Sequence, residues 1–149
     1  MEYNEVKQCL MACPDLAGLD EACAAALFWR GLEQTLEAGA VVYAESEKLD
    51  GSFCLLLFGD LILEKAGEIL GGVSERQIFG EMAYFTDQQA RNATIRVGSP
   101  VAVILKFHLT SDELASPQFA ALKRCLSLQT WDKFVNNSQA LAQEVCAEI

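Results

Sequence analysis

The chain has 149 residues, of which 52% are hydrophobic and 21% are charged, with ten Gly and only three Pro. This composition indicates a compact globular chain, long enough to bury a core without disulfides or a structural metal. Its 11 Lys and Arg against 21 Asp and Glu give a formal net charge of −10. We therefore expect neither nucleic acid nor a membrane surface as a partner, and any anionic ligand needs a focused local site.

Apolar runs and cysteine spacing indicate where the protein works. The longest runs, 22–29 and 53–58, fall far short of the roughly 20 residues of a membrane span. The first residues lack the cationic and apolar segments of a secretory signal, so we expect a cytoplasmic protein. A single histidine, His108, leaves no His pair for a zinc site. The cysteines form no Cys-x-x-Cys pair and are expected to be free thiols: Cys9, Cys13, Cys23, Cys54, Cys125 and Cys146.

The pattern along the chain predicts helices, then strands, then helices. Residues 19–27 are strong helix formers, and the preceding segment is expected to be helical too. From residue 32 onward, short apolar runs separated by Gly or Asp are typical of an all-β barrel or sandwich. The expected strands are 32–37, 40–44, 53–58, 61–65, 69–73, 93–97 and 101–107.

A helical pattern returns after the last expected strand. Thr110 and Glu113 fit a capping box, and Ser116 followed by Pro117 fits a second helix start. We expect a single domain over 1–149, with N-terminal helices over about 1–31, a β region over about 32–108 and C-terminal helices over about 110–149. The amphipathic tail suggests a homodimer through this last helix, with folding back onto the β region as the alternative.

The segment 78–96 departs from the β pattern and carries the candidate chemistry. Gly80 lies where a strand turns into a short helix, whose first turn presents unpaired amides to an oxyanion. Glu81 lies at the same turn; it would repel a phosphate and so suits a neutral hydroxyl. Arg91 is expected on the next strand, where its planar guanidinium can pair with two phosphate oxygens.

Charge around this segment supports a local anion site. No Lys occurs over 66–105, whereas three of the five arginines do: Arg76, Arg91 and Arg96. Together these groups indicate a pocket for a phosphate attached to a sugar with a free hydroxyl. The alternative is that Glu81 and Arg91 form a rim ion pair with each other, which contributes little to stability. No nucleophile with a positioned base is visible, so we do not expect an enzyme.

Phe-Gly-Glu-Met-Ala at 79–83 and Arg-Asn-Ala-Thr at 91–94 resemble the phosphate-binding cassette of the cyclic-nucleotide-binding domain family. The similarity extends to 36–43 and 50–59 and covers roughly 16–135. It implies a mainly β fold, a double-stranded β-helix or jelly-roll-like β-roll, with N-terminal helices and C-terminal hinge helices. It also implies cyclic AMP or cyclic GMP as the ligand, with no cofactor.

The resemblance assigns a role to each cassette position. It implies that Glu81 accepts the ribose 2′-hydroxyl and that Arg91 pairs with the cyclic phosphate. The remaining phosphate oxygens would be held by the amides around Gly80, Met82, Ala83, Asn92 and Ala93. Trp131 or Phe134 could form an aromatic lid over the base, with ordinary helix packing as the alternative.

The sequence also departs from the family at several turns. Ser46, Leu49 and Arg76 stand where relatives usually carry glycine, so these turns are expected to be built differently. Asn92 stands where relatives more often have Ala, Ser or Thr, which leaves the choice between cyclic AMP and cyclic GMP open.

The sequence thus favours a cyclic-nucleotide-binding regulatory module whose ligand shifts the position of the helices after Thr110, acting on an unidentified downstream protein. The alternative is a degenerate domain that no longer responds to nucleotide and acts as a protein-interaction or dimerisation module. A DNA-binding regulator is not expected, because few residues follow Val135 and the net charge is unfavourable.

Overall fold

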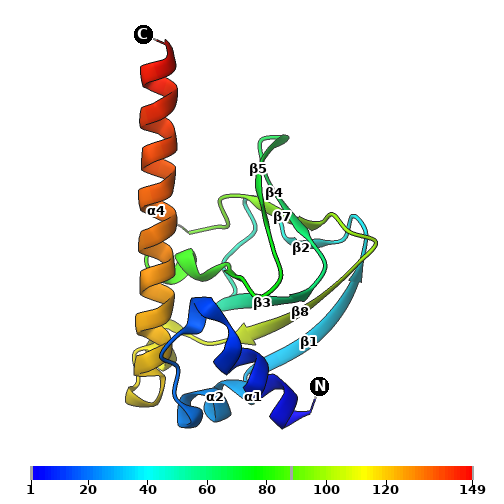
Figure 1. Cartoon of the computed structure of the whole chain (residues 1–149), viewed down its shortest axis with the longest axis vertical. Helices are drawn as coiled ribbons and strands as arrows, with labels where there is room; N and C mark the ends of the chain where they lie inside the picture. Colours follow the sequence, from blue (N-terminus) through cyan, green and yellow to red (C-terminus); the bar gives the residue numbers. More distant parts are fainter. Residues whose placement is uncertain (1, 88, 149) are drawn as a thin grey trace.

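The computed structural model describes residues 2–87 and 89–148, with side chains described as far as Val135. Helices lie at both ends of the chain and strands lie between them (Figure 1). The N-terminal helices are α1 (Tyr3–Ala12), the 3-10 turn η1 (Pro14–Leu16) and α2 (Glu21–Phe28). The C-terminal helices are α3 (Ser111–Leu114), the 3-10 turn η3 (Pro117–Phe119) and α4 (Ala120–Glu148).

Within these described residues, eight antiparallel strands form two four-stranded sheets, ordered β1-β8-β3-β6 and β2-β7-β4-β5. Their bounds are β1 (Gly31–Glu37), β2 (Val41–Tyr43), β3 (Ser52–Phe58), β4 (Leu61–Lys65), β5 (Glu68–Val73), β6 (Ile78–Phe79), β7 (Thr94–Val97) and β8 (Val101–His108). This confirms the expected β-roll with flanking helices. The strands predicted from the apolar runs are all present, within a residue or two at their ends.

Strand β3 of the first sheet is buried on both of its faces, which explains its unbroken apolar run. One face packs on the helices, where Leu10, Leu27, Phe107 and Leu126 are fully buried in one core. The other face packs on the second sheet in a separate core inside the roll. The inner core holds Tyr43, Cys54, Leu56, Leu61, Phe79, Ile95, Val97, Ala102 and Ile104. The N-terminal and C-terminal helices thus share a core with the sheet that carries β3.

Helix α4 runs along one side of the roll and projects past it (Figure 1). The short helix α3 precedes α4 and begins with the predicted capping box, in which Thr110 and Glu113 exchange two hydrogen bonds of 3.1 Å. Farther along, Trp131 and Phe134 stack on each other with centroids 6.3 Å apart and remain 63% and 59% exposed. Packing of these two rings into the core, one of the two expectations, is therefore wrong.

Two turns at the departures from the family pattern keep a glycine-like backbone. Ser46 and Arg76 have φ of 70° and 67°, a left-handed conformation that costs most residues energy, whereas Leu49 does not adopt positive φ. The Ser46 amide donates to the carbonyl of Arg91 (2.8 Å), and the Arg76 amide donates to the carbonyl of Leu56 (2.7 Å). These bonds hold the turns against the strain. The expectation that these two turns are built differently is therefore wrong.

The cysteines within the described part of the chain are free, as predicted: Cys9, Cys13, Cys23, Cys54 and Cys125. Burial raises the pKa of Cys54 to about 12, which keeps it a neutral thiol inside the roll. Cys146 lies outside the described side chains. No helix in the described part of the chain combines the length and apolarity that a membrane crossing requires.

Candidate functional site

The candidate site begins at the turn from β6 into the 3-10 turn η2 (Glu81–Tyr84), which is the short helix predicted after Gly80. Gly80 caps this turn with φ of 84°. A Cβ at this position would lie 2.8 Å from the Tyr43 ring and 3.3 Å from Nη1 of Arg91. Both the backbone conformation and the close approach therefore require glycine here.

We expect Gly80→Ala to lower the free energy of unfolding by about 2 kcal/mol, because the new methyl group meets a buried ring on a strained backbone. Urea denaturation measures this loss. Gly71→Ala is the matched control, since Gly71 is exposed on β5 with no atom within 4 Å of an added Cβ. Equal losses in the two variants would show that the turn at Gly80 tolerates a side chain.

Glu81 is the most deeply buried charged group of the site, with no exposed surface. One carboxylate oxygen, Oε1, forms an ion pair with Lys133 of α4. The same ammonium donates to the carbonyl of Ile78 at 3.1 Å. The second oxygen, Oε2, is buried and has no hydrogen-bond partner. Glu81 thus joins the cassette to the C-terminal helix and retains one unused acceptor.

Arg91 lies in the connection before β7, not on a strand as predicted. Its amide donates to the carbonyl of Glu47, and its carbonyl accepts from the amide of Ser46, both at 2.8 Å. An isolated bridge between Lys48 and Ala90 extends this pairing. The backbone is thereby fixed to the loop after β2, which leaves Arg91 outside the β7 ladder.

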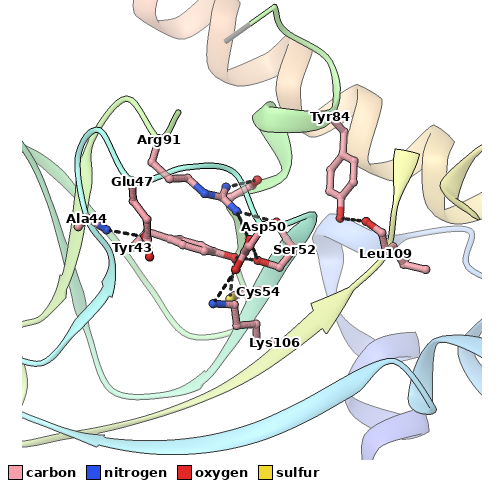
Figure 2. A network of polar contacts seen from close by, with 11 residues as sticks. Tyr43, Ala44, Glu47, Asp50, Ser52, Cys54, Tyr84, Arg91, Lys106 and Leu109 are labelled. Atoms are coloured by element: carbon pink, nitrogen blue, oxygen red, sulfur yellow. Dashed lines mark hydrogen bonds and ion pairs between the residues drawn. The ribbon is translucent and has the colours of Figure 1, made fainter. Parts of the chain in front are cut away.

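The Arg91 guanidinium points into the roll and is only 6% exposed (Figure 2). Nη1 donates to the carbonyl of Gly80 at 2.9 Å. Nη2 donates to the carbonyl of Ser52 at 3.0 Å and to the Asp50 carboxylate at 3.1 Å. The cation lies 3.7 Å from the centroid of the Tyr43 ring. Its Nε is buried without a partner, so Arg91 also retains one unused polar group.

Asp50 joins two cations at this position (Figure 2). It accepts from Arg91 on one oxygen and pairs with Lys106 at 3.2 Å on the other. Although burial opposes the ionisation of Asp50, the hydrogen bond from Ser52 and the charge of Lys106 hold its pKa below the ordinary value. The carboxylate stays ionised, and the cluster of Arg91, Lys106 and Asp50 carries a net charge of one positive unit.

The two predicted site residues therefore have separate partners, so the alternative that Glu81 and Arg91 pair with each other is wrong. Met82 and Ala83 are half-buried in η2, while Asn92 is exposed and Ala93 is buried directly after Arg91. The structure thus gathers the predicted residues around one turn and one connection.

Other arginines do not join this group. Arg96 pairs with Glu64 between β7 and β4. Arg76 is exposed at its turn, where its carbonyl accepts from the Cys13 thiol at 2.9 Å. Of the three arginines in the predicted cationic segment, only Arg91 enters the site.

Sequence reasoning missed Lys133, Lys106 and Tyr43 as members of the site. A signal for Lys133 was present, since it follows the buried Leu126 by seven residues and so lies on the same face of α4. Among the described side chains, no three His, Cys, Asp or Glu residues gather in a metal-binding arrangement.

Two surface hollows lie away from these groups. One of about 370 Å³ lies at the start of α4, beside Ser116 and Arg124. Another of about 260 Å³ lies between α1 and β1, beside Val6 and Leu32. Neither is lined by Glu81 or Arg91, and the side chains of both residues are buried in this conformation.

The structure is thus a two-sheet β-roll with a glycine-capped turn beside a buried Glu and a buried Arg. The family model for the cyclic nucleotide-binding domain matches residues 33–110, more than half of the chain. The chain therefore belongs to the cyclic nucleotide-binding domain family. None of the curated protein sequences matches this chain significantly.

Solved structures share the fold. PfPKA-R bound to cAMP superposes with a TM-score of 0.69 and 18% identity, over 92% of this chain and 47% of that one. The sensor domain of the transcriptional regulator DNR from Pseudomonas aeruginosa superposes with a TM-score of 0.66 and 24% identity, over 83% of this chain and 91% of that one. A regulatory subunit of a cAMP-independent protein kinase A from Trypanosoma cruzi, bound to guanosine, superposes with a TM-score of 0.67 and 14% identity, over 82% of this chain and 42% of that one. The chain thus spans less than half the length of these kinase regulatory subunits.

Proposed function

We propose that the chain is a single-domain, non-catalytic regulatory module that binds a cyclic nucleotide, cyclic AMP or cyclic GMP, and changes the position of α4 when it does. Two unused buried groups carry the proposal: Oε2 of Glu81 is an acceptor without a donor, and Nε of Arg91 is a donor without an acceptor. Such groups are costly to bury and are typical of a site that awaits a partner. A cyclic nucleotide brings a ribose hydroxyl and an anionic oxygen in one molecule.

Charge supports an anionic ligand at this position. Arg91 and Lys106 together outweigh Asp50 by one unit, inside a chain whose overall charge is −10. A cyclic phosphodiester carries one negative charge and would neutralise the cluster. Because the net charge of the chain makes most of its surface unfavourable to anions, this local positive charge favours an anionic ligand here.

The binding site we propose follows the cassette, with Glu81 on the ribose hydroxyl and Arg91 on the phosphate. Backbone amides would hold the other phosphate oxygens, at Gly80, Met82, Ala83, Asn92 and Ala93. The chain would act in the cytoplasm on a downstream protein, without a cofactor. Ligand binding would act by population shift, which requires the nucleotide to prefer one position of α4 over the other.

Isothermal titration of the full chain with cyclic AMP and cyclic GMP tests the proposal, with 5′-AMP as the non-cyclic control. We expect saturable binding of at least one cyclic nucleotide. Binding at a hundredfold excess over the dissociation constant would also stabilise the fold by about 2.7 kcal/mol. No binding of either at millimolar concentration, to protein shown to be folded, would reject the proposal.

The second candidate is the degenerate domain that acts through protein contacts. One observation in its favour is that side chains of the same chain already pair with Glu81 and Arg91. Another is that α4 exposes Leu128, Trp131 and Phe134, which a second copy of the chain could cover. Sedimentation separates the two candidates: a dimer that forms equally with and without nucleotide, together with a silent titration, would support this one.

A further inference from the structure

We propose that Lys133 is a built-in gate of the nucleotide site, so that ligand can reach Glu81 only when α4 gives up its ion pair. This inference rests on the proposed function and names the regulation of the same site. It is carried by the burial of Glu81 and by the contacts of one lysine.

Access is the first step of the argument. Glu81 has no exposed surface, so no ligand can contact either of its carboxylate oxygens until a covering group moves. Lys133 is the polar group that lies on Glu81, and its own side chain is 36% exposed. Lys133 is therefore the member of the pair that solvent can reach, whereas Glu81 cannot contact solvent in this position of α4.

The position of Lys133 on α4 lets the gate also hold the helix against the roll. The base of α4 is anchored in the core through Leu122 and Leu126. Farther along, the only hydrogen bonds that described side chains of α4 make to the roll are those of Lys133 to Glu81 and to the carbonyl of Ile78. The C-terminal end of the helix projects beyond the roll (Figure 1). Release of this one side chain would therefore remove these polar contacts between the distal part of α4 and the roll.

The ion pair between Lys133 and the buried Glu81 stabilises the closed position of α4. Removal of one partner of a buried ion pair leaves a charge that the protein does not compensate, which is strongly unfavourable. Without the ammonium, the closed position of α4 would bury the Glu81 carboxylate with no cation on it. Loss of Lys133 should therefore raise the fraction of molecules that are open to ligand, and apparent affinity rises with that fraction.

The test compares the affinity of cyclic nucleotide for three full-length variants with that of the wild type. Lys133→Met keeps the aliphatic stem but removes the charge, and it should bind at least about tenfold more tightly. Lys133→Arg keeps the charge and should bind like the wild type. Lys123→Met is the matched control, because Lys123 is an exposed lysine near the base of the same helix. Circular dichroism establishes that each variant is folded.

Hydrogen exchange of the ligand-free proteins gives a second readout. Amides of α4 after Leu126 should exchange faster in Lys133→Met than in Lys123→Met or the wild type. If the wild type binds a cyclic nucleotide and Lys133→Met binds it with equal or lower affinity, the gate is wrong and the proposed function stands. No binding by any of the proteins would remove the proposed function, and the gate with it.

Discussion

Replacement of Arg91 by methionine should lower the free energy of unfolding by about 3 kcal/mol, because a buried guanidinium and its hydrogen bonds are lost from a partly buried ion pair. The carbonyls of Gly80 and Ser52 would lose their donor, and Asp50 would keep only Lys106 as a charged partner. Urea denaturation at neutral pH measures the loss. The buried guanidinium makes this the largest effect on stability that we predict.

Arg124→Met is the control for this experiment, since Arg124 is an exposed arginine on α4. Its effect should stay within about 0.5 kcal/mol. Equal stability of Arg91→Met and the wild type would mean that the guanidinium contacts contribute nothing to the fold. Because Arg91 is predicted to hold both the roll and the phosphate, its nucleotide affinity is informative only under conditions where the variant is folded.

The second large effect concerns the ribose. The wild type should bind cyclic AMP about 10–100-fold more tightly than 2′-deoxy cyclic AMP, because a hydrogen bond to a buried carboxylate contributes more than one between neutral groups. In Glu81→Ala this preference should fall to within about twofold. Calorimetric titration of both ligands into both proteins measures the ratio, which also cancels any effect of α4 opening on overall affinity.

Glu5→Ala is the control for the ribose experiment, because Glu5 is an exposed carboxylate on α1. It should keep the full preference for the 2′-hydroxyl. If Glu81→Ala retained that preference as well, another group would hold the ribose, and the role of Glu81 in the cassette would be wrong.

Much of the fold could be predicted because its signals are local. Short apolar runs broken by Gly or Asp gave the strands, and the spacing of Thr110 and Glu113 gave the capping box that the structure contains. Gly80 was predictable in the same way, since one turn of chain sets its backbone conformation. Local signals also misled, because Ser46 and Arg76 adopt the conformation that glycine would favour.

The partners of the site residues were not predictable, because they come from distant parts of the chain. Lys133 lies 52 residues after Glu81, and Asp50 lies 41 residues before Arg91. No periodic pattern in the sequence connects such distant residues. The charged side chains could therefore be identified from the sequence, but their ion-pair partners could not. The placement of Arg91 in the connection before β7, fixed by backbone pairing with the loop after β2, was missed for the same reason.

The central claim is that Glu81 and Arg91 face one ligand once α4 is released, and a crystal structure grown in excess cyclic nucleotide tests it most directly. We predict the phosphate against Arg91 and the amides of Gly80 to Ala83, the ribose hydroxyl on Glu81, and Lys133 displaced from the carboxylate. A nucleotide bound elsewhere, with the contacts of Glu81 to Lys133 and of Arg91 to Asp50 intact, would contradict the account.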